Sequence, residues 1–135
     1  MQEHPMKSKG GPGRILNAAR YSAQGLRAAL KHEAAFRQEL LISLPLLCLL
    51  PWVAQSRLHG LLLLGVWVLV WVVELLNSAV EALADALSMD QVPLLGRAKD
   101  LGSAAVFLTL NFALLTWGFA VWDAVSGAAR GAVGA

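Results

Sequence analysis

Long apolar runs separated by short polar segments dominate the chain. Residues 58–73 are apolar almost throughout, and residues 101–122 form a run of 22 that carries no charge. Because a helix needs about 20 apolar residues to cross a bilayer, each run predicts a transmembrane helix. The helical pattern of the first run continues past Glu74 toward Leu87, beyond the length that the hydrocarbon requires.

A shorter apolar stretch, residues 40–54, precedes these two runs. A helix that begins near Glu33 and ends near Ala54 reaches the required length, and we interpret it as another crossing. Pro45 predicts a kink and Pro51 lies near the exit, while residues 55–60 and 88–95 are predicted to be connections. The chain is therefore predicted to be an all-α membrane protein with three transmembrane helices.

The N-terminal part of the chain is amphipathic instead of apolar. Within residues 14–31, apolar and small side chains recur at helical spacing between basic ones, namely Arg14, Arg20, Arg27 and Lys31. This pattern predicts a surface helix whose basic side chains meet anionic lipid phosphates, although an ordinary solvated helix shows the same pattern. We expect a disordered tail at residues 1–13, a membrane domain at 14–125 and a C-terminal tail at 126–135.

The composition agrees with a membrane protein. Hydrophobic residues make up 57% of the 135-residue chain and charged residues only 15%, which is too apolar for a water-soluble domain of this length. The net charge is +2 and the basic residues are spread out, so no nucleic-acid partner is predicted. The single cysteine, Cys48, excludes an internal disulfide and a cysteine-rich zinc site.

The distribution of basic residues predicts the orientation. The N-terminal region and the second connection, which leads to Arg97 and Lys99, are basic, whereas the first connection contains only Arg57. Lysine and arginine accumulate on the cytoplasmic side of membrane proteins. The N-terminus and the second connection are therefore predicted to face the cytoplasm.

The positions of the five tryptophans along the predicted spans indicate which of them anchor a helix at the membrane interface. Trp52, Trp117 and Trp122 fall near helix ends, where tryptophan commonly anchors a helix at the membrane interface. Trp67 and Trp71 lie in the middle of a span, and we interpret them as packing or lipid-facing side chains.

One face of the second predicted transmembrane helix carries a polar stripe. Its members lie at offsets of 0, 3, 4, 7 and 11 residues: Glu74, Asn77, Ser78, Glu81 and Asp85. A carboxylate at membrane depth is costly unless it is paired, protonated or hydrated, so a function is the first hypothesis for Glu74. Hydrogen bonding between helices is the alternative for the whole stripe.

Two further polar groups lie at predicted membrane surfaces. Residues 96–103 combine Arg97, Lys99 and Asp100 with small residues, a set that suits a phosphoryl group and its charge. Two carboxylates from different segments, such as Glu33 and Glu81, suit Mg²⁺ with bound nucleotide phosphates. Basic residues that only fix the topology, and solvated helix ends, explain the same side chains without a site.

These segments resemble the small prokaryotic membrane-integral diacylglycerol kinases. The resemblance rests on Arg14, AARYS at 18–22, EAAFRQE at 33–39, ELLNSAVE at 74–81 and GRAKDLGSAA at 96–105, and it extends to about Trp122. It implies a homotrimer in a bacterial inner membrane, in which each protomer has one surface helix and three transmembrane helices. The active sites would form between neighbouring subunits.

The resemblance also implies an activity and its residues. The reaction would transfer the γ-phosphoryl group of ATP to diacylglycerol with Mg²⁺ as cofactor, with Glu74 as general base, Asn77 in support, and Glu33 and Glu81 as metal ligands. The implied nucleotide-binding set is Arg14, Tyr21, Glu33, Glu81, Lys99 and Asp100. The implied lipid-binding set is Arg14, Ser22, Ala35, Gln38, Glu39, Glu74 and Ser103.

Three other functions stay open on the sequence alone. Undecaprenol kinases look similar in fold and active-site motifs but phosphorylate a polyprenol, although residues 34–39 and 96–105 look more like the diacylglycerol branch. A small proton- or ion-conducting oligomer explains the stripe but not the cytoplasmic cluster. A purely structural bundle predicts that Glu74→Gln is harmless.

Overall fold

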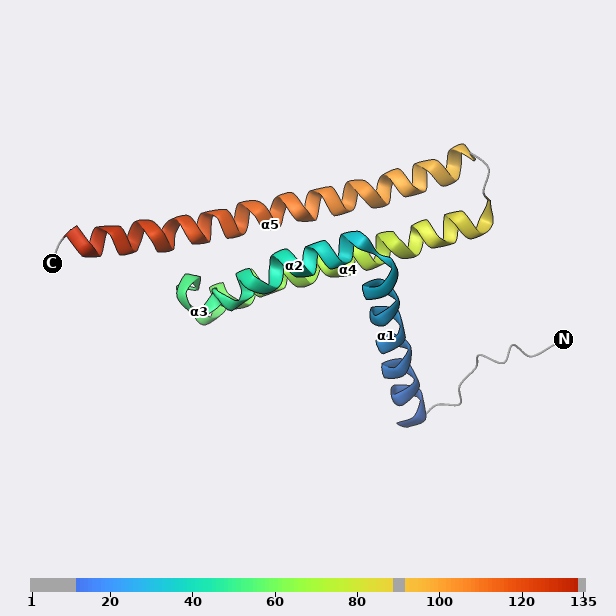
Figure 1. Ribbon diagram of the computed structural model, residues 1–135, viewed down its shortest axis with the longest axis horizontal. Coiled ribbons are helices and arrows are strands. Elements are labelled where there is room, and N and C mark those ends of the chain that lie inside the picture. The colour runs from blue at the N-terminus through green and yellow to red at the C-terminus, as the bar shows by residue number, and fades with distance from the viewer. Residues whose placement is uncertain (1–11, 89–91, 134–135) are drawn as a thin grey trace. The chain divides into compact units, whose positions relative to one another are not determined.

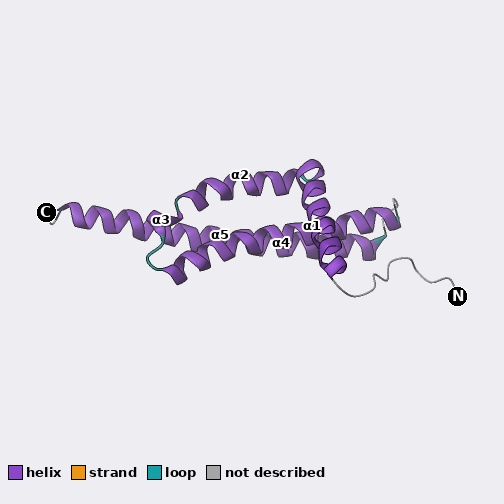
Figure 2. Cartoon of the chain, turned by 90° about the horizontal axis from the view of Figure 1, so that it is seen from below, coloured by secondary structure: helices purple, strands orange, loops and turns teal. Residues whose placement is uncertain are grey.

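The computed structural model describes residues 12–88 and 92–133, and all regular structure within these ranges is helical (Figure 2). The chain divides into two compact units, residues 1–33 and residues 34–135, and each is described by itself. The all-α fold class predicted from the hydrophobic pattern is thereby confirmed.

The described part of the first unit is one helix, α1 (Pro12–His32). Proline suits the start of a helix, because its missing N–H would have no partner there, and Lys31 and His32 lie in the last turn, where positive charge is favourable. The backbone N–H of Glu33 donates to the carbonyl of Ala29 at 2.9 Å and closes the helix. The helix predicted for residues 14–31 is confirmed, whereas residues 1–11 of the predicted tail lie outside the described residues.

Two long helices form the body of the second unit. Helices α4 (Arg57–Leu87) and α5 (Pro93–Val133) run antiparallel and side by side, and α2 (Ala34–Cys48) lies along α4 (Figure 1). The short helix α3 (Leu50–Val53) contacts both α4 and α5. The unit is therefore a helical hairpin with a third helical segment packed on α4.

The core of the second unit lies between α4 and α5, near the end that α3 covers. Its buried members are Val53, Leu63, Val66, Trp67, Val70, Ala113, Trp117 and Ala120. On α5 the residues Ala113, Trp117 and Ala120 recur at helical spacing, so one face alternates small side chains with a large one. The alanines leave room for the indole ring between the two helices.

Trp117 corrects the prediction that it anchors the helix at the membrane interface. Its side chain is only 4% exposed, and its Nε1–H donates to the backbone carbonyl of Leu63 on α4 at 3.1 Å. An indole is large and apolar and has one donor, so it packs well where a carbonyl lies within reach. Trp52 and Trp122 are 75% and 70% exposed, as side chains at an interface would be.

Within residues 12–88 and 92–133, two helices are long and apolar enough to cross a membrane, Arg57–Leu87 and the Pro93–Gly127 part of α5. They correspond to two of the three predicted crossings. The remaining predicted crossing, from Glu33 to Ala54, is divided: α2 continues through Pro45 but ends at Cys48, and α3 follows as a separate turn. Pro51 stands at the start of α3, a position that proline tolerates well.

The connections are shorter than predicted. Ser56 caps α4, because its Oγ accepts a hydrogen bond from the backbone N–H of His59 at 3.1 Å, so the helix already begins at Arg57 within the predicted 55–60 turn. Helix α5 begins at Pro93, two residues before the predicted 88–95 connection ends. It continues to Val133, through most of the segment predicted as a C-terminal tail.

Candidate functional site

The polar stripe lies on one continuous helix, as its spacing predicts. Glu74 is 4% exposed, Asn77, Ser78 and Glu81 are half-buried, and Asp85 is exposed. Along this stripe, burial therefore decreases toward the C-terminal end of α4. Such a gradient places one carboxylate in an apolar setting and others near water on the same helical face.

A second buried carboxylate comes from α2. Glu39 is 6% exposed, its Oε2 atom is buried without a hydrogen-bond partner among the described residues, and it lies near enough to Glu74 for the two carboxyl groups to interact. Burying an acidic side chain is unfavourable unless its charge is neutralised or solvated. Two acidic side chains from neighbouring helices therefore share one apolar environment, which indicates a functional site more than a structural contact.

A hydrogen bond that sequence reasoning missed fixes α2 against α4 beside these carboxylates. The Nε1–H of Trp71 donates to the Oγ of Ser43 at 3.2 Å, and Ser43 is fully buried. Ser43 lies one turn after Glu39, and Trp71 lies one turn before Glu74. The bond therefore sets the register of the two helices next to Glu39 and Glu74. The sequence signal that could have indicated this bond is Ser43, a polar residue in the otherwise apolar stretch of residues 40–54.

Asn77 joins the stripe to α5. Its Nδ2 donates to Oε1 of Glu81 at 3.2 Å, and its Oδ1 is buried without a hydrogen-bond partner among the described residues. On α5, Gly102 lies so close to this amide that a side chain there would meet it. Asn77 and Glu81 are thus connected on α4, with a glycine of α5 against the amide.

Lys99 is the basic residue that the described structure brings to the stripe. Its Nζ lies 3.0 Å from Oδ1 of Asp85, which raises the pKa of the ammonium group, and the more distant Glu81 raises it to a smaller extent. Asp100 and Ser103, which neighbour it on α5, are exposed. Asp85 belongs to the predicted stripe but was assigned no role, so its pairing with Lys99 is a finding of the structure.

The remaining predicted site residues lie elsewhere. Ala35 and Gln38 are exposed on α2. Arg14, Tyr21 and Ser22 are exposed on α1 in the first unit, and Glu33, half-buried, is the last residue of that unit. The described second unit therefore brings together Glu39, Glu74, Asn77, Glu81 and Lys99.

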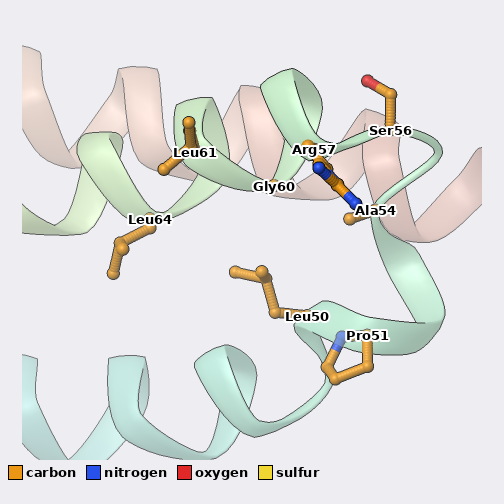
Figure 3. A pocket seen from close by; sticks show the side chains of 8 residues that line it. All are labelled: Leu50, Pro51, Ala54, Ser56, Arg57, Gly60, Leu61 and Leu64. Atoms are coloured by element: carbon orange, nitrogen blue, oxygen red, sulfur yellow. The ribbon is translucent and has the colours of Figure 1, made fainter.

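An apolar groove at the other end of the hairpin is separate from these residues. It is lined by Leu50, Pro51, Ala54, Ser56, Arg57, Gly60, Leu61 and Leu64 (Figure 3). Gly60 lies 14 residues before Glu74 on α4, which corresponds to about 21 Å along a helix. The groove therefore does not contain the carboxylates.

The fold and site define a class before any relative is considered. The described part of the chain is helical and has two helices suited to a membrane. Two buried carboxyl groups, Glu39 and Glu74, lie deeper than the amide of Asn77, the carboxylate of Glu81 and the ammonium group of Lys99, which are nearer to water. An apolar substrate with one reactive polar group could meet a water-soluble co-substrate at such a boundary. Ionisable side chains at membrane depth generally have a function, so the arrangement indicates a membrane protein with a functional site at this boundary.

Comparison with known proteins identifies the family. The family model described as prokaryotic diacylglycerol kinase matches residues 20–121. A protein named diacylglycerol kinase from Escherichia coli strain K12 is 44% identical over 110 residues, which cover 82% of this chain and 90% of that protein. The protein of the same name from Pseudomonas aeruginosa is 44% identical over 117 residues, covering 87% and 95% respectively. One from Helicobacter pylori strain 26695 is 40% identical over 117 residues, covering 86% and 90%.

The chain belongs to the prokaryotic diacylglycerol kinase family, since the matched region spans most of its length. The resemblance noted in the sequence is thereby confirmed, and the protein is a kinase. All residues of the second-unit site lie within the matched region.

Proposed function

We propose that this protein transfers the γ-phosphoryl group of ATP to the hydroxyl group of diacylglycerol and forms phosphatidic acid and ADP. The observation that carries the proposal is the buried carboxylate of Glu74 on a helix long enough to span a membrane, one turn from Asn77 and two from Glu81. This arrangement supports a reaction between a lipid hydroxyl and a water-soluble nucleotide, and the family supports the choice of substrates.

Glu74 is the proposed general base. In the reaction the lipid oxygen forms a bond to the γ-phosphorus while the bond from phosphorus to the bridging oxygen of ADP breaks, and Glu74 accepts the hydroxyl proton. An ionisable side chain that is 4% exposed in an apolar helix pair needs a functional reason, and proton transfer supplies one. The supporting role proposed for Asn77, one turn further along α4, would be exerted through Glu81, to which its Nδ2 donates at 3.2 Å.

Glu33 and Glu81 are the proposed magnesium ligands. Glu81 fits this role because its carboxylate offers the hard oxygen atoms that Mg²⁺ prefers and is half-buried where α4 approaches water. Mg²⁺ generally uses one or two carboxylates together with phosphates and waters, so a dedicated cage of protein ligands is not required. When bound, the ion would neutralise charge on the nucleotide phosphates.

Lys99, Asp100, Arg14 and Tyr21 are the proposed nucleotide contacts. The ammonium group of Lys99 lies at the end of the stripe, where its Nζ is 3.0 Å from Oδ1 of Asp85. Positive charge at this place stabilises a transferring phosphoryl group. For the lipid, the proposed contacts are Arg14, Ser22, Ala35, Gln38, Glu39, Glu74 and Ser103.

We further propose a bacterial inner-membrane protein with three crossings and its active site at the cytoplasmic face. The first crossing would consist of α2 and α3 together, because residues 34 to 53 have the length that a bilayer requires and are apolar from residue 40 onward. The domain would comprise residues 14–125. Three copies of the chain would assemble, with composite active sites between neighbouring subunits.

The substrate is tested by reconstitution in lipid with Mg²⁺ and radiolabelled ATP. Diacylglycerol and undecaprenol are supplied separately, and the phosphorylated lipids are separated and counted. The proposal predicts that diacylglycerol gains phosphate faster than undecaprenol at equal mole fraction. Faster labelling of undecaprenol would overturn the lipid assignment, and labelling of neither lipid by folded protein would overturn the kinase proposal.

A further inference from the structure

Gly102 on α5 lies against the side chain of Asn77 on α4. A Cβ atom built on Gly102 would lie 3.3 Å from Cγ and 3.8 Å from Cα of Asn77, and it would overlap the Oδ1 atom. Glycine is unfavourable inside a helix compared with alanine, so a glycine retained there needs a reason. The close approach of Asn77 supplies this reason.

Among the glycines of α5 whose surroundings the structure describes, only Gly102 has such a contact. On the same helix, a Cβ atom at Gly96, Gly118 or Gly127 would meet nothing within 4 Å. Gly118 is also exposed. An alanine at Gly118 would therefore be accommodated, whereas an alanine at Gly102 would have to displace the Asn77 amide or move α5 away from α4.

The orientation of this amide matters for Glu81. The Nδ2 group of Asn77 donates to Oε1 of Glu81 at 3.2 Å, while Oδ1 occupies the space that a Gly102 side chain would need. The amide is planar, so displacing Oδ1 also turns Nδ2. A methyl group at position 102 would thereby remove the hydrogen bond that orients the Glu81 carboxylate.

We propose that Gly102 is a positioning residue: its missing side chain lets Asn77 hold Glu81 in its binding orientation. This inference rests on the proposed function, in which Glu81 binds Mg²⁺ with the nucleotide. Gly102 has no side chain with which to bind substrate or metal. Its effect passes from α5 through the Asn77 amide to the Glu81 carboxylate.

The test compares Gly102→Ala with Gly118→Ala and the unmodified protein. Binding of Mn²⁺, with a non-hydrolysable ATP analogue present, is followed by electron paramagnetic resonance, a readout that requires no catalysis. Diacylglycerol phosphorylation is titrated with Mg²⁺ and, separately, with lipid. Gly102→Ala should weaken Mn²⁺ binding and raise the half-saturating Mg²⁺ concentration at least tenfold, with the lipid KM unchanged. Gly118→Ala should match the unmodified protein in each measurement.

A double variant separates positioning from a loss of folding. In Asn77→Ala the obstructing amide is absent, so adding Gly102→Ala should weaken Mn²⁺ binding no further than Asn77→Ala alone does. If Gly102→Ala by itself fails to fold, the double variant should fold again. Equal Mn²⁺ binding by Gly102→Ala and the unmodified protein would overturn the inference. Additive losses of Mn²⁺ binding in the double variant would also overturn it. If Gly102→Ala does not fold, failure of the double variant to fold would overturn it as well.

Failure of the proposed function gives a different result. If the unmodified protein and Gly118→Ala bind Mn²⁺ and nucleotide but phosphorylate no diacylglycerol, the substrate proposal fails. The Mn²⁺ titrations then still decide whether Gly102 positions Glu81 through Asn77.

Discussion

The Nζ atom of Lys99 lies 3.0 Å from Oδ1 of Asp85, so an ion pair joins α5 to α4 one helical turn beyond Glu81. The two side chains are 39% and 63% exposed. Exposed ion pairs contribute little to stability because water and salt weaken them. The pair is better understood as a means of keeping the Lys99 ammonium near Glu81.

Replacing Asp85 tests this interpretation. In Asp85→Asn the Lys99 ammonium loses its charged partner and should sample other positions, so the KM for ATP should rise several-fold while the thermal unfolding midpoint changes little. Steady-state kinetics with varied ATP and thermal unfolding in detergent measure the two quantities. Asp123→Asn, at an exposed position near the other end of α5, is the matched control. An ATP KM equal to that of the control would show that Asp85 does not position Lys99.

The buried indole of Trp117 predicts a difference between two tryptophans on α5. Trp117→Phe loses the hydrogen bond to the Leu63 carbonyl and should destabilise the folded protein by about 1 kcal/mol. Trp122→Phe should leave stability unchanged, because that side chain is 70% exposed. Unfolding by denaturant in mixed micelles gives both values. Equal stabilities of the two variants would contradict the packing of Trp117 between α4 and α5.

The bond between Trp71 and Ser43 predicts coupled effects on activity. Ser43→Ala and Trp71→Phe each remove one partner, and hydrogen bonds between membrane helices contribute about 0.6 kcal/mol on average. Each variant should fold with slightly lower stability and lose part of its kinase activity, because α2 is then less well fixed beside Glu74. The double variant should be no worse than the more affected single variant. Fully additive losses would argue against a shared bond.

The proposed three crossings predict which positions a membrane-impermeant thiol reagent can reach. In a Cys48→Ser background, Gln55→Cys precedes α4 and Val92→Cys precedes α5, and both positions are exposed. Sealed inside-out vesicles should label only the cysteine at 92, and right-side-out spheroplasts only the cysteine at 55. Labelling of both positions from the same side would contradict the orientation.

The long helices could be predicted from the sequence because their signals are local. An uncharged run of 22 residues needs no partner to be read as a membrane helix, and the offsets between Glu74 and Asp85 place these residues on one face of any helix. Both expectations hold on α4 and α5. The spacing also led to Glu81 and Asn77, which a hydrogen bond joins.

The contacts between helices could not be predicted in this way. A tryptophan near a helix end has the same local sequence signal whether it anchors at an interface or packs against a neighbour, so Trp117 was assigned wrongly. Gly102 was within a recognised segment, but its role depends on which face of α5 meets Asn77. Ser43 and Trp71 are 28 residues apart, and only the packing of α2 on α4 brings them together.

The most direct test of the account is the activity of Glu74→Gln beside Glu74→Asp. Glutamine keeps the size of the side chain but cannot accept a proton as a carboxylate can, whereas aspartate keeps the carboxylate on a shorter stem. Phosphatidic acid formed from diacylglycerol and radiolabelled ATP is measured for variants whose Mn²⁺-nucleotide binding equals that of the unmodified protein. The account predicts that Glu74→Gln loses at least a hundredfold in kcat and that Glu74→Asp retains measurable activity with an altered pH profile. Near-normal turnover by Glu74→Gln would contradict the assignment of Glu74 as the base.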